Sequence, residues 1–149
     1  MSTIVVGVDG SDHAARALRW ALDLAAVTQA RVAAVAAWNV APMAYGGPGM
    51  VVPVDVHECE RGAETTLDEA VASVPGGIPA GVEVERHVVE GGAAGALIEE
   101  ARRHEATLLV VGTRGHGGFT GLLLGSVSAA LAHHAPCPLV IVPPVPANR

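Results

Sequence analysis

Short apolar runs alternate along this chain with longer segments in which apolar residues recur at helical spacing. The apolar runs predict five strands, over Ile4 to Val8, Arg31 to Trp38, Val82 to Val89, Thr107 to Val111 and Pro138 to Val142. The first helical segment begins after Ser11, a good N-cap residue, and its alanines and leucines recur from Ala14 to Ala25. The same spacing predicts further helices, over Asp55 to about Val74, Ala93 to His104 and Ser126 to His134.

Strands that alternate with helices predict a doubly wound α/β fold with a parallel sheet, because right-handed crossovers place helices on both faces. The common flavodoxin-like order of five such strands is 3-2-1-4-5, which sets the first and fourth strands side by side. The chain has 149 residues, the length of one domain, and we predict a single domain over residues 1–149.

A glycine-rich segment follows the fourth predicted strand and precedes the last predicted helix. It reads Gly112-Thr113-Arg114-Gly115, then nine residues, then Gly125-Ser126-Val127-Ser128. Glycines let backbone N–H groups approach a polyanion, and a helix N-terminus adds unpaired N–H groups and a favourable dipole. Turn geometry alone would not explain why two glycine groups frame one helix start. The segment therefore predicts a phosphate site for a nucleoside triphosphate.

A second segment is expected to converge on this site. Ligands of doubly wound sheets bind beyond the carboxyl ends of the strands, where the strand order reverses. In the predicted order those ends are Gly7-Val8-Asp9 and Gly112 to Gly115, which are far apart in the sequence. We predict that they line one crevice. Asp9 has an alternative role in capping the first helix, and the two roles are compatible.

The chain contains no lysine, and all nine of its basic side chains are arginines. This excludes a Walker A loop and Schiff-base chemistry, which both require a lysine. A bound triphosphate would be held by backbone amides, hydroxyls and an arginine such as Arg114. We therefore expect a divalent cation, Mg²⁺, to neutralise the phosphates, held mainly by the phosphates themselves with Asp9 as a candidate protein ligand.

Charge and hydropathy restrict the partners. The net charge is −6 and no basic run is present, which argues against a nucleic acid or a membrane surface as partner. No apolar run approaches the roughly 20 residues that span a bilayer, and the N-terminus lacks a signal-peptide pattern, so we expect a cytoplasmic protein. His133, His134 and Cys137 lack zinc-ligand spacing, and we expect no metal site built by the protein alone.

Two motifs resemble the ATP-binding branch of the universal stress protein family. They are Val-Gly-Val-Asp-Gly-Ser at residues 6 to 11 and Gly-x2-Gly-x9-Gly-Ser from Gly112 to Ser126. The resemblance covers the whole chain, and it implies that Asp9 contacts the ribose or the metal-bound phosphates and that the Ala37 backbone bonds adenine. The nucleotide-binding residues expected in all are Gly7, Val8, Asp9, Ala37, Gly91, Gly112, Thr113, Arg114, Gly115, His116, Gly117, Gly118, Gly125, Ser126, Val127 and Ser128.

The favoured function is that of an ATP-binding regulatory or stress-response protein. A slow ATPase or nucleotidyl-transferring enzyme and a binder of AMP or a cyclic nucleotide are the alternatives. No nucleophile elbow, zinc motif or poised base is evident in the sequence, so we assign no catalytic residue and expect at most weak ATP hydrolysis. A dinucleotide or flavin site ranks last, because the first strand is not followed by Gly-x-Gly-x-x-Gly.

The last predicted strand carries a prediction about assembly. In the order 3-2-1-4-5 it lies at an edge of the sheet, and from Leu139 to Val142 it is wholly apolar. An exposed edge of this kind invites aggregation unless it is covered. Pairing with the same strand of a second copy would cover both edges, and the family resemblance implies the same homodimer.

Overall fold

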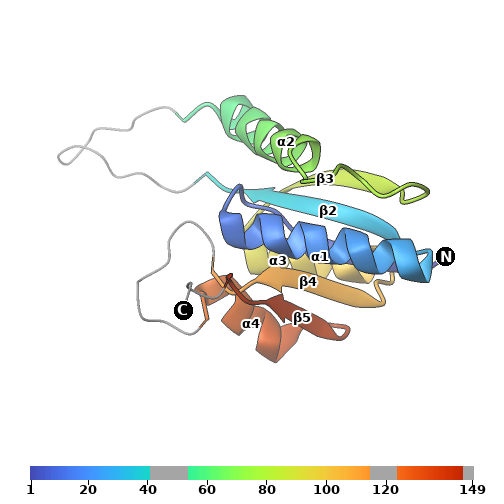
Figure 1. The fold of residues 1–149 in the computed structure, drawn as a ribbon. Helices are drawn as coiled ribbons and strands as arrows, with labels where there is room; N and C mark the ends of the chain where they lie inside the picture. The colour runs from blue at the N-terminus through green and yellow to red at the C-terminus, as the bar shows by residue number, and fades with distance from the viewer. Residues whose placement is uncertain (41–53, 115–123, 146–149) are drawn as a thin grey trace, which may run out of the picture.

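Five strands and four helices alternate along the described part of the chain (Figure 1). The structure is a computed structural model that describes residues 1–40, 54–114 and 124–145. The strands are β1 (Thr3–Gly7), β2 (Arg31–Trp38), β3 (Val84–Glu90), β4 (Leu108–Gly112) and β5 (Leu139–Val142). The helices are α1 (Asp12–Thr28), α2 (Val56–Ala72), α3 (Ala93–Arg103) and α4 (Ser126–His134).

The strands form one sheet in the order β3-β2-β1-β4-β5, and every neighbouring pair is parallel. This confirms the doubly wound α/β fold and the strand order predicted from the sequence. The bounds of β2 and α4 agree with the prediction to the residue. The strand β3 begins two residues later than predicted and ends one residue later, at Glu90.

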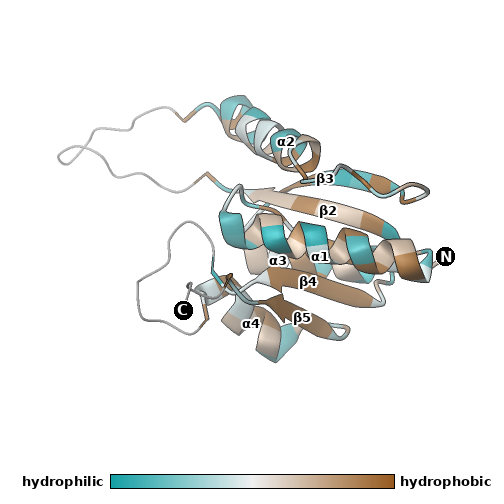
Figure 2. Ribbon diagram, in the orientation of Figure 1, coloured by the Kyte–Doolittle hydropathy of each residue, from teal (hydrophilic) through white to brown (hydrophobic). Residues whose placement is uncertain are grey.

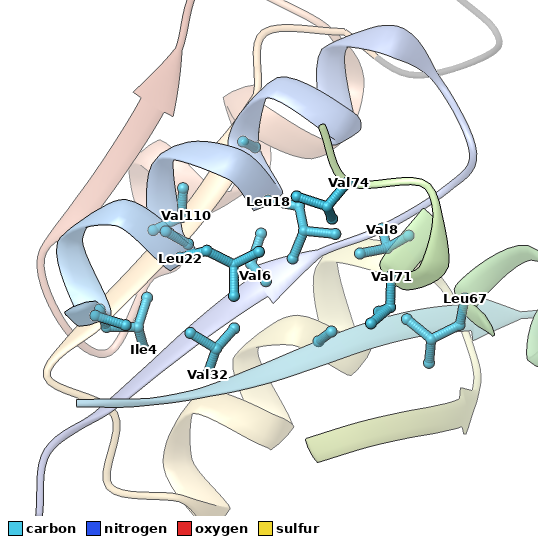
Figure 3. Packing of buried hydrophobic residues seen from close by; sticks show 14 of the residues in the cluster. Ile4, Val6, Val8, Leu18, Leu22, Val32, Leu67, Val71, Val74 and Val110 are labelled. Atoms are coloured by element: carbon cyan, nitrogen blue, oxygen red, sulfur yellow. The ribbon is translucent and has the colours of Figure 1, made fainter. Parts of the chain in front are cut away.

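The helices form a layer on each face of the sheet, with α1 and α2 on one face and α3 and α4 on the other (Figure 1). Each face has its own apolar cluster. Under α1 and α2 it contains Leu18, Leu22 and Leu67 with valines of the strands (Figure 3). Under α3 and α4 it contains Leu97, Leu109 and Leu131. The strands between these layers are largely hydrophobic, as expected of a sheet covered on both faces (Figure 2).

The four helices begin in two different ways. The side chain of Ser11 accepts a hydrogen bond from Ala14 N at 3.2 Å and caps α1, and Asp55 caps α2 in the same way. The helices α3 and α4 instead begin after Gly92 and Gly125, which provide no side-chain cap. Their first N–H groups therefore have no acceptor from the capping residue. Within the described ranges, no helix is long and apolar enough to cross a membrane.

Candidate functional site

The first turn of α1 packs directly against the carboxyl end of β4. His13 Nδ1 lies 3.1 Å from Thr113 Oγ1, and a Cβ atom placed on Gly112 would lie only 2.7 Å from the backbone of His13. Backbone atoms yield to such a contact only if α1 shifts, so this position strongly favours glycine. The structure thus brings together the two segments expected to converge, Gly7 to Asp9 and Gly112 to Arg114. The glycine at position 112 is also explained by this packing, independently of any ligand.

Thr113 joins the end of β4 to the beginning of α4. Its buried carbonyl oxygen accepts from Gly125 N at 2.6 Å and from Ser128 Oγ at 2.9 Å. The side chain of Ser128 is 2% exposed and therefore serves this junction. A Cβ atom on Gly125 would lie 3.2 Å from Arg114 Cα, which leaves little room for a side chain. Because the Gly125 N–H is occupied, the backbone donors left for a ligand are the first N–H groups of α4.

Arg114 and Ser126 provide further donors beside this helix start. The Arg114 side chain is half-buried, and its Nε atom is buried with no hydrogen-bond partner among the described residues. A buried donor without an acceptor costs free energy, of about 1–3 kcal/mol or more for a charged group. Ser126 is exposed in the first turn of α4, where no acidic residue is present. The arrangement favours an anion at this end of the sheet.

Asp9 follows β1 and supports the start of α1. Its Oδ1 atom accepts from Ser11 N at 2.9 Å and from Ser11 Oγ at 2.5 Å. These bonds hold the serine that caps α1, so Asp9 stabilises the cap indirectly. The Asp9 residue is exposed, and its Oδ2 atom makes no hydrogen bond with the described residues. One carboxylate oxygen therefore remains free to bind a cation or a hydroxyl group.

The other strand residues expected to bind nucleotide lie at the carboxyl ends of the strands. Val8 is buried, and its N–H donates to Val35 O at 2.8 Å, so its amide belongs to the sheet. Ala37 pairs with Val89 at the ends of β2 and β3. Gly91 follows β3 with a φ of +135°, which favours glycine, and its N–H donates to Trp38 O at 2.8 Å. Gly115, His116, Gly117 and Gly118 lie outside the described residues.

A cleft of about 400 Å³ opens beside Asp9, within the range of cofactor sites. It lies between the beginning of α1 and the helix α2, and Thr66 and Glu69 of α2 form part of its wall. No residue of β4 or α4 is among those that line it. The cleft therefore extends from Asp9 toward α2, and Arg114 and the start of α4 are not part of its wall.

Sequence reasoning missed His13, Thr66 and Glu69 as residues near the site. His13 lies in the first turn of a helix and Glu69 in the last turn of another, and neither belongs to a motif. Their positions depend on how α1 packs against β4 and how α2 packs over the sheet. The spacing of residues along the sequence therefore does not indicate that these three lie near the site.

The parallel order with a reversal between β1 and β4 defines the class of doubly wound α/β proteins that bind ligands at the switch point. A family model for universal stress proteins matches residues 1–143, and the chain belongs to the universal stress protein family. It is 36% identical over 140 residues to a universal stress protein of Thermus aquaticus, covering 94% of this chain and 97% of that protein.

Two further relatives are a longer protein and a protein of solved structure. A universal stress protein of Mycolicibacterium smegmatis is 35% identical over 142 residues, and the match covers 95% of this chain but only 45% of that protein. The chain thus spans less than half of that relative. A universal stress protein solved in complex with cAMP is similar with a TM-score of 0.71 and 28% identity, covering 95% of this chain and 96% of the other.

Proposed function

We propose that this chain binds an adenine nucleotide where the ends of β1 and β4 meet, and that occupancy by ATP regulates it. The junction between α1 and β4 supports the proposal most directly. It sets the first turn of α1, which follows Asp9, against the end of β4, from which Arg114 and the uncapped start of α4 follow. An acidic group beside anion-binding donors is the combination that a metal-bound phosphate chain requires.

The residues present fit a phosphate group with Mg²⁺. The donors for the phosphates are the first N–H groups of α4, the Ser126 hydroxyl and the unpartnered Arg114 Nε. They would take the place of a lysine, which the chain lacks. When bound, Mg²⁺ would neutralise phosphate oxygens, and Asp9 Oδ2 is the protein oxygen that could reach the ion or its water. The adenine ring would lie toward the end of β2, where the backbone of Ala37 would recognise it.

A monophosphate ligand is the second candidate. The relative at 28% identity was solved in complex with cAMP, which shows that this fold accommodates a cyclic nucleotide in that protein. For the present chain, the motif Gly-x2-Gly-x9-Gly-Ser from Gly112 to Ser126 resembles that of the ATP-binding branch of the family. We therefore favour ATP over AMP or cAMP.

Regulation is favoured over rapid catalysis by the groups at the site. The titratable side chains there are Asp9, His13 and Arg114, and Asp12 and Glu69 line the adjoining cleft. The contacts of Asp9 and His13 serve the helix cap and the packing of α1 on β4. Among the described residues, none is arranged to orient a water in line with a phosphate and also to stabilise the leaving group. Binding would thus select a conformation or a partner, with slow turnover at most.

Titration calorimetry with ATP, AMP and cAMP, each with Mg²⁺, tests the site. Gly125→Val should abolish binding, because its Cβ would crowd Arg114 and Thr113 and displace the start of α4. Gly95→Val is the matched control, since Gly95 also lies at the start of a helix and has open space around it. ATP binding by Gly125→Val equal to that of the wild type would refute the site, and tighter binding of cAMP than of ATP would favour the second candidate.

Single-turnover hydrolysis of bound ATP separates a regulator from an enzyme. We expect the bound nucleotide to be recovered largely as ATP after many minutes. A steady-state rate near the enzyme median of about 10 per second would overturn the regulatory function while leaving the binding site intact.

We also propose that the protein forms a homodimer through β5. This strand ends the sheet next to β4, and the residues from Leu139 to Ile141 are half-buried in the single chain. The side chains of this strand are all apolar, and none of them is charged. Antiparallel pairing with a second copy would satisfy the free backbone groups of both edges.

A further inference from the structure

A cluster of histidine and glutamate side chains lies on the edge strand β3 and the end of α3. Glu85 and His87 project from the same face of β3, and His104 ends α3 beside them. One ligand atom from each of the three lies within 4.8 Å of the other two. Glu85 is the second residue of β3, His87 is in its middle and His104 follows the end of α3, whereas the candidate nucleotide site is at the carboxyl ends of the strands. The cluster therefore plays no part in that site.

The distances suit a metal ion of small radius. Glu85 Oε2 lies 3.2 Å from His87 Nε2, and the rings of His87 and His104 meet edge to face with centroids 4.6 Å apart. Donor atoms of a tetrahedral zinc site, with bonds of about 2.0–2.1 Å, lie about 3.3 Å apart. Glu85 and His87 already have this spacing, and the His104 ligand atom, which lies within 4.8 Å of both, would have to move inward to provide the third position.

The carboxylate of Glu100 lies beside both imidazole rings. It is fully buried, and Oε2 lies 3.6 Å from His87 Nδ1 and 3.2 Å from His104 Nε2. The guanidinium of Arg103 lies 3.0 Å from the other oxygen. Histidines that bind metals usually present their second nitrogen to a carboxylate, which fixes the ring and its tautomer. For His87 this arrangement leaves Nε2, the nitrogen beside Glu85, as the one available to an ion.

Each carboxylate of the cluster has an arginine beside one oxygen and an imidazole beside the other. Arg31 pairs with Glu85 Oε1 at 3.5 Å, which leaves Oε2 of that carboxylate toward His87. The buried Glu100 has Arg103 as its counterion on Oε1, and its Oε2 faces both imidazoles. The side chains of Glu85, His87 and His104 are 40%, 27% and 13% exposed, so an ion could reach them from solvent.

We propose that Glu85, His87 and His104 bind a divalent transition metal such as Zn²⁺, with Glu100 as the positioning residue and water as the fourth ligand. Imidazole and carboxylate ligands favour Zn²⁺, Ni²⁺ or Cu²⁺ over Mg²⁺ and Ca²⁺, which prefer oxygen ligands alone. The site belongs to the edge of the sheet opposite β5 and would be occupied whether or not nucleotide is bound.

Zinc titration of the nucleotide-free full chain, by calorimetry and by competition with a chelating dye, tests the proposal. The wild type should bind one Zn²⁺ at this cluster, and Glu85→Gln and His104→Ala should each weaken that binding by at least about tenfold. The double variant His133→Ala with His134→Ala is the matched control, because these neighbouring rings on α4 are exposed and belong to no group of metal-ligand atoms found among the described residues. Its zinc binding should equal that of the wild type.

Cobalt provides a readout of coordination as well as of affinity. Co²⁺ in a four-coordinate site absorbs strongly in the visible region, and Glu85→Gln should lose this absorption. The Glu85 side chain is partly exposed, so this variant tests the site even where His104→Ala unfolds by depriving the buried Glu100 of a partner. Circular dichroism of the metal-free variants checks the fold. Zinc binding that survives Glu85→Gln and His104→Ala, or wild-type protein that binds no Zn²⁺ below about 1 mM, would overturn the proposal.

Discussion

Gly112 shows how a single residue can serve packing and a ligand site at once. The backbone of His13 would lie 2.7 Å from a Cβ atom at this position. We expect Gly112→Ala to lower the free energy of unfolding by about 1–3 kcal/mol, because α1 must shift from β4 to admit the methyl group. Urea denaturation measures the change. Gly95→Ala, a helix position with open space, should instead raise stability by about 0.5–1 kcal/mol. Equal effects of the two variants would contradict the close packing.

Cys137 is a residue whose chemistry is set by its surroundings. It packs half-buried against the apolar cluster under α3 and α4, and this burial raises the pKa of its thiol. In the Cys59→Ser variant, labelling of Cys137 by a thiol reagent should therefore require a higher pH in the folded protein than in urea. Because the unfolded thiol ionises first, this residue's contribution to stability is present at neutral pH and is lost as pH rises through the folded pKa. Identical labelling profiles in the two states would contradict the effect of burial.

At the scale of elements, the junction of β4 and α4 depends on hydrogen bonds to one carbonyl group. Ser128 Oγ donates to Thr113 O at 2.9 Å in a buried setting. We expect Ser128→Ala to lower the free energy of unfolding by about 1 kcal/mol, because the Thr113 carbonyl keeps only its bond from Gly125 N. Thermal denaturation measures this loss of stability.

Ser126→Ala is the informative partner of that variant. Ser126 is exposed on the same helix, so its loss should change stability by less than about 0.5 kcal/mol. It should nevertheless weaken ATP binding, because the hydroxyl is one of the proposed phosphate donors. If Ser126→Ala destabilised the protein as much as Ser128→Ala, the division between a structural and a ligand-facing serine would be wrong.

At the scale of the whole molecule, β5 is the edge where a second copy is proposed to pair. Pro138 O accepts from Leu109 N at 3.0 Å, and the backbone groups of successive strand residues face opposite edges, so the N–H of Ile141 faces outward. Proline is tolerated on an edge strand where the missing N–H would face solvent. We therefore expect Ile141→Pro to keep the fold and to sediment as a monomer, while the wild type sediments as a dimer at micromolar concentrations.

Val140→Pro distinguishes loss of the dimer from loss of the fold. The N–H of Val140 faces β4 by the same alternation, so proline there should break the sheet and destabilise each chain. A wild-type protein that sediments as a monomer, or an Ile141→Pro variant that remains dimeric, would exclude pairing through β5.

The sequence by itself determined the order and type of the elements, because burial on both faces of a parallel sheet forces apolar runs and helical spacing. It predicted the bounds of β2 and α4, the cap at Ser11 and the strand order 3-2-1-4-5. The glycines at 112 and 125 were likewise visible in the sequence, and their positions beside the switch point follow from that order.

Only the tertiary structure decided which side chains meet. The packing of α1 on β4 gives Gly112 its neighbour His13 and leaves the Nε atom of Arg114 buried. Glu85 and His87 are two residues apart, which places them on one face of a strand. Glu100 and His104 are four residues apart, which places them on one face of a helix. No rule of spacing joins one pair to the other. They become a cluster because α3 packs over β2 and brings its last turn beside β3, a contact set by the shape of the whole core.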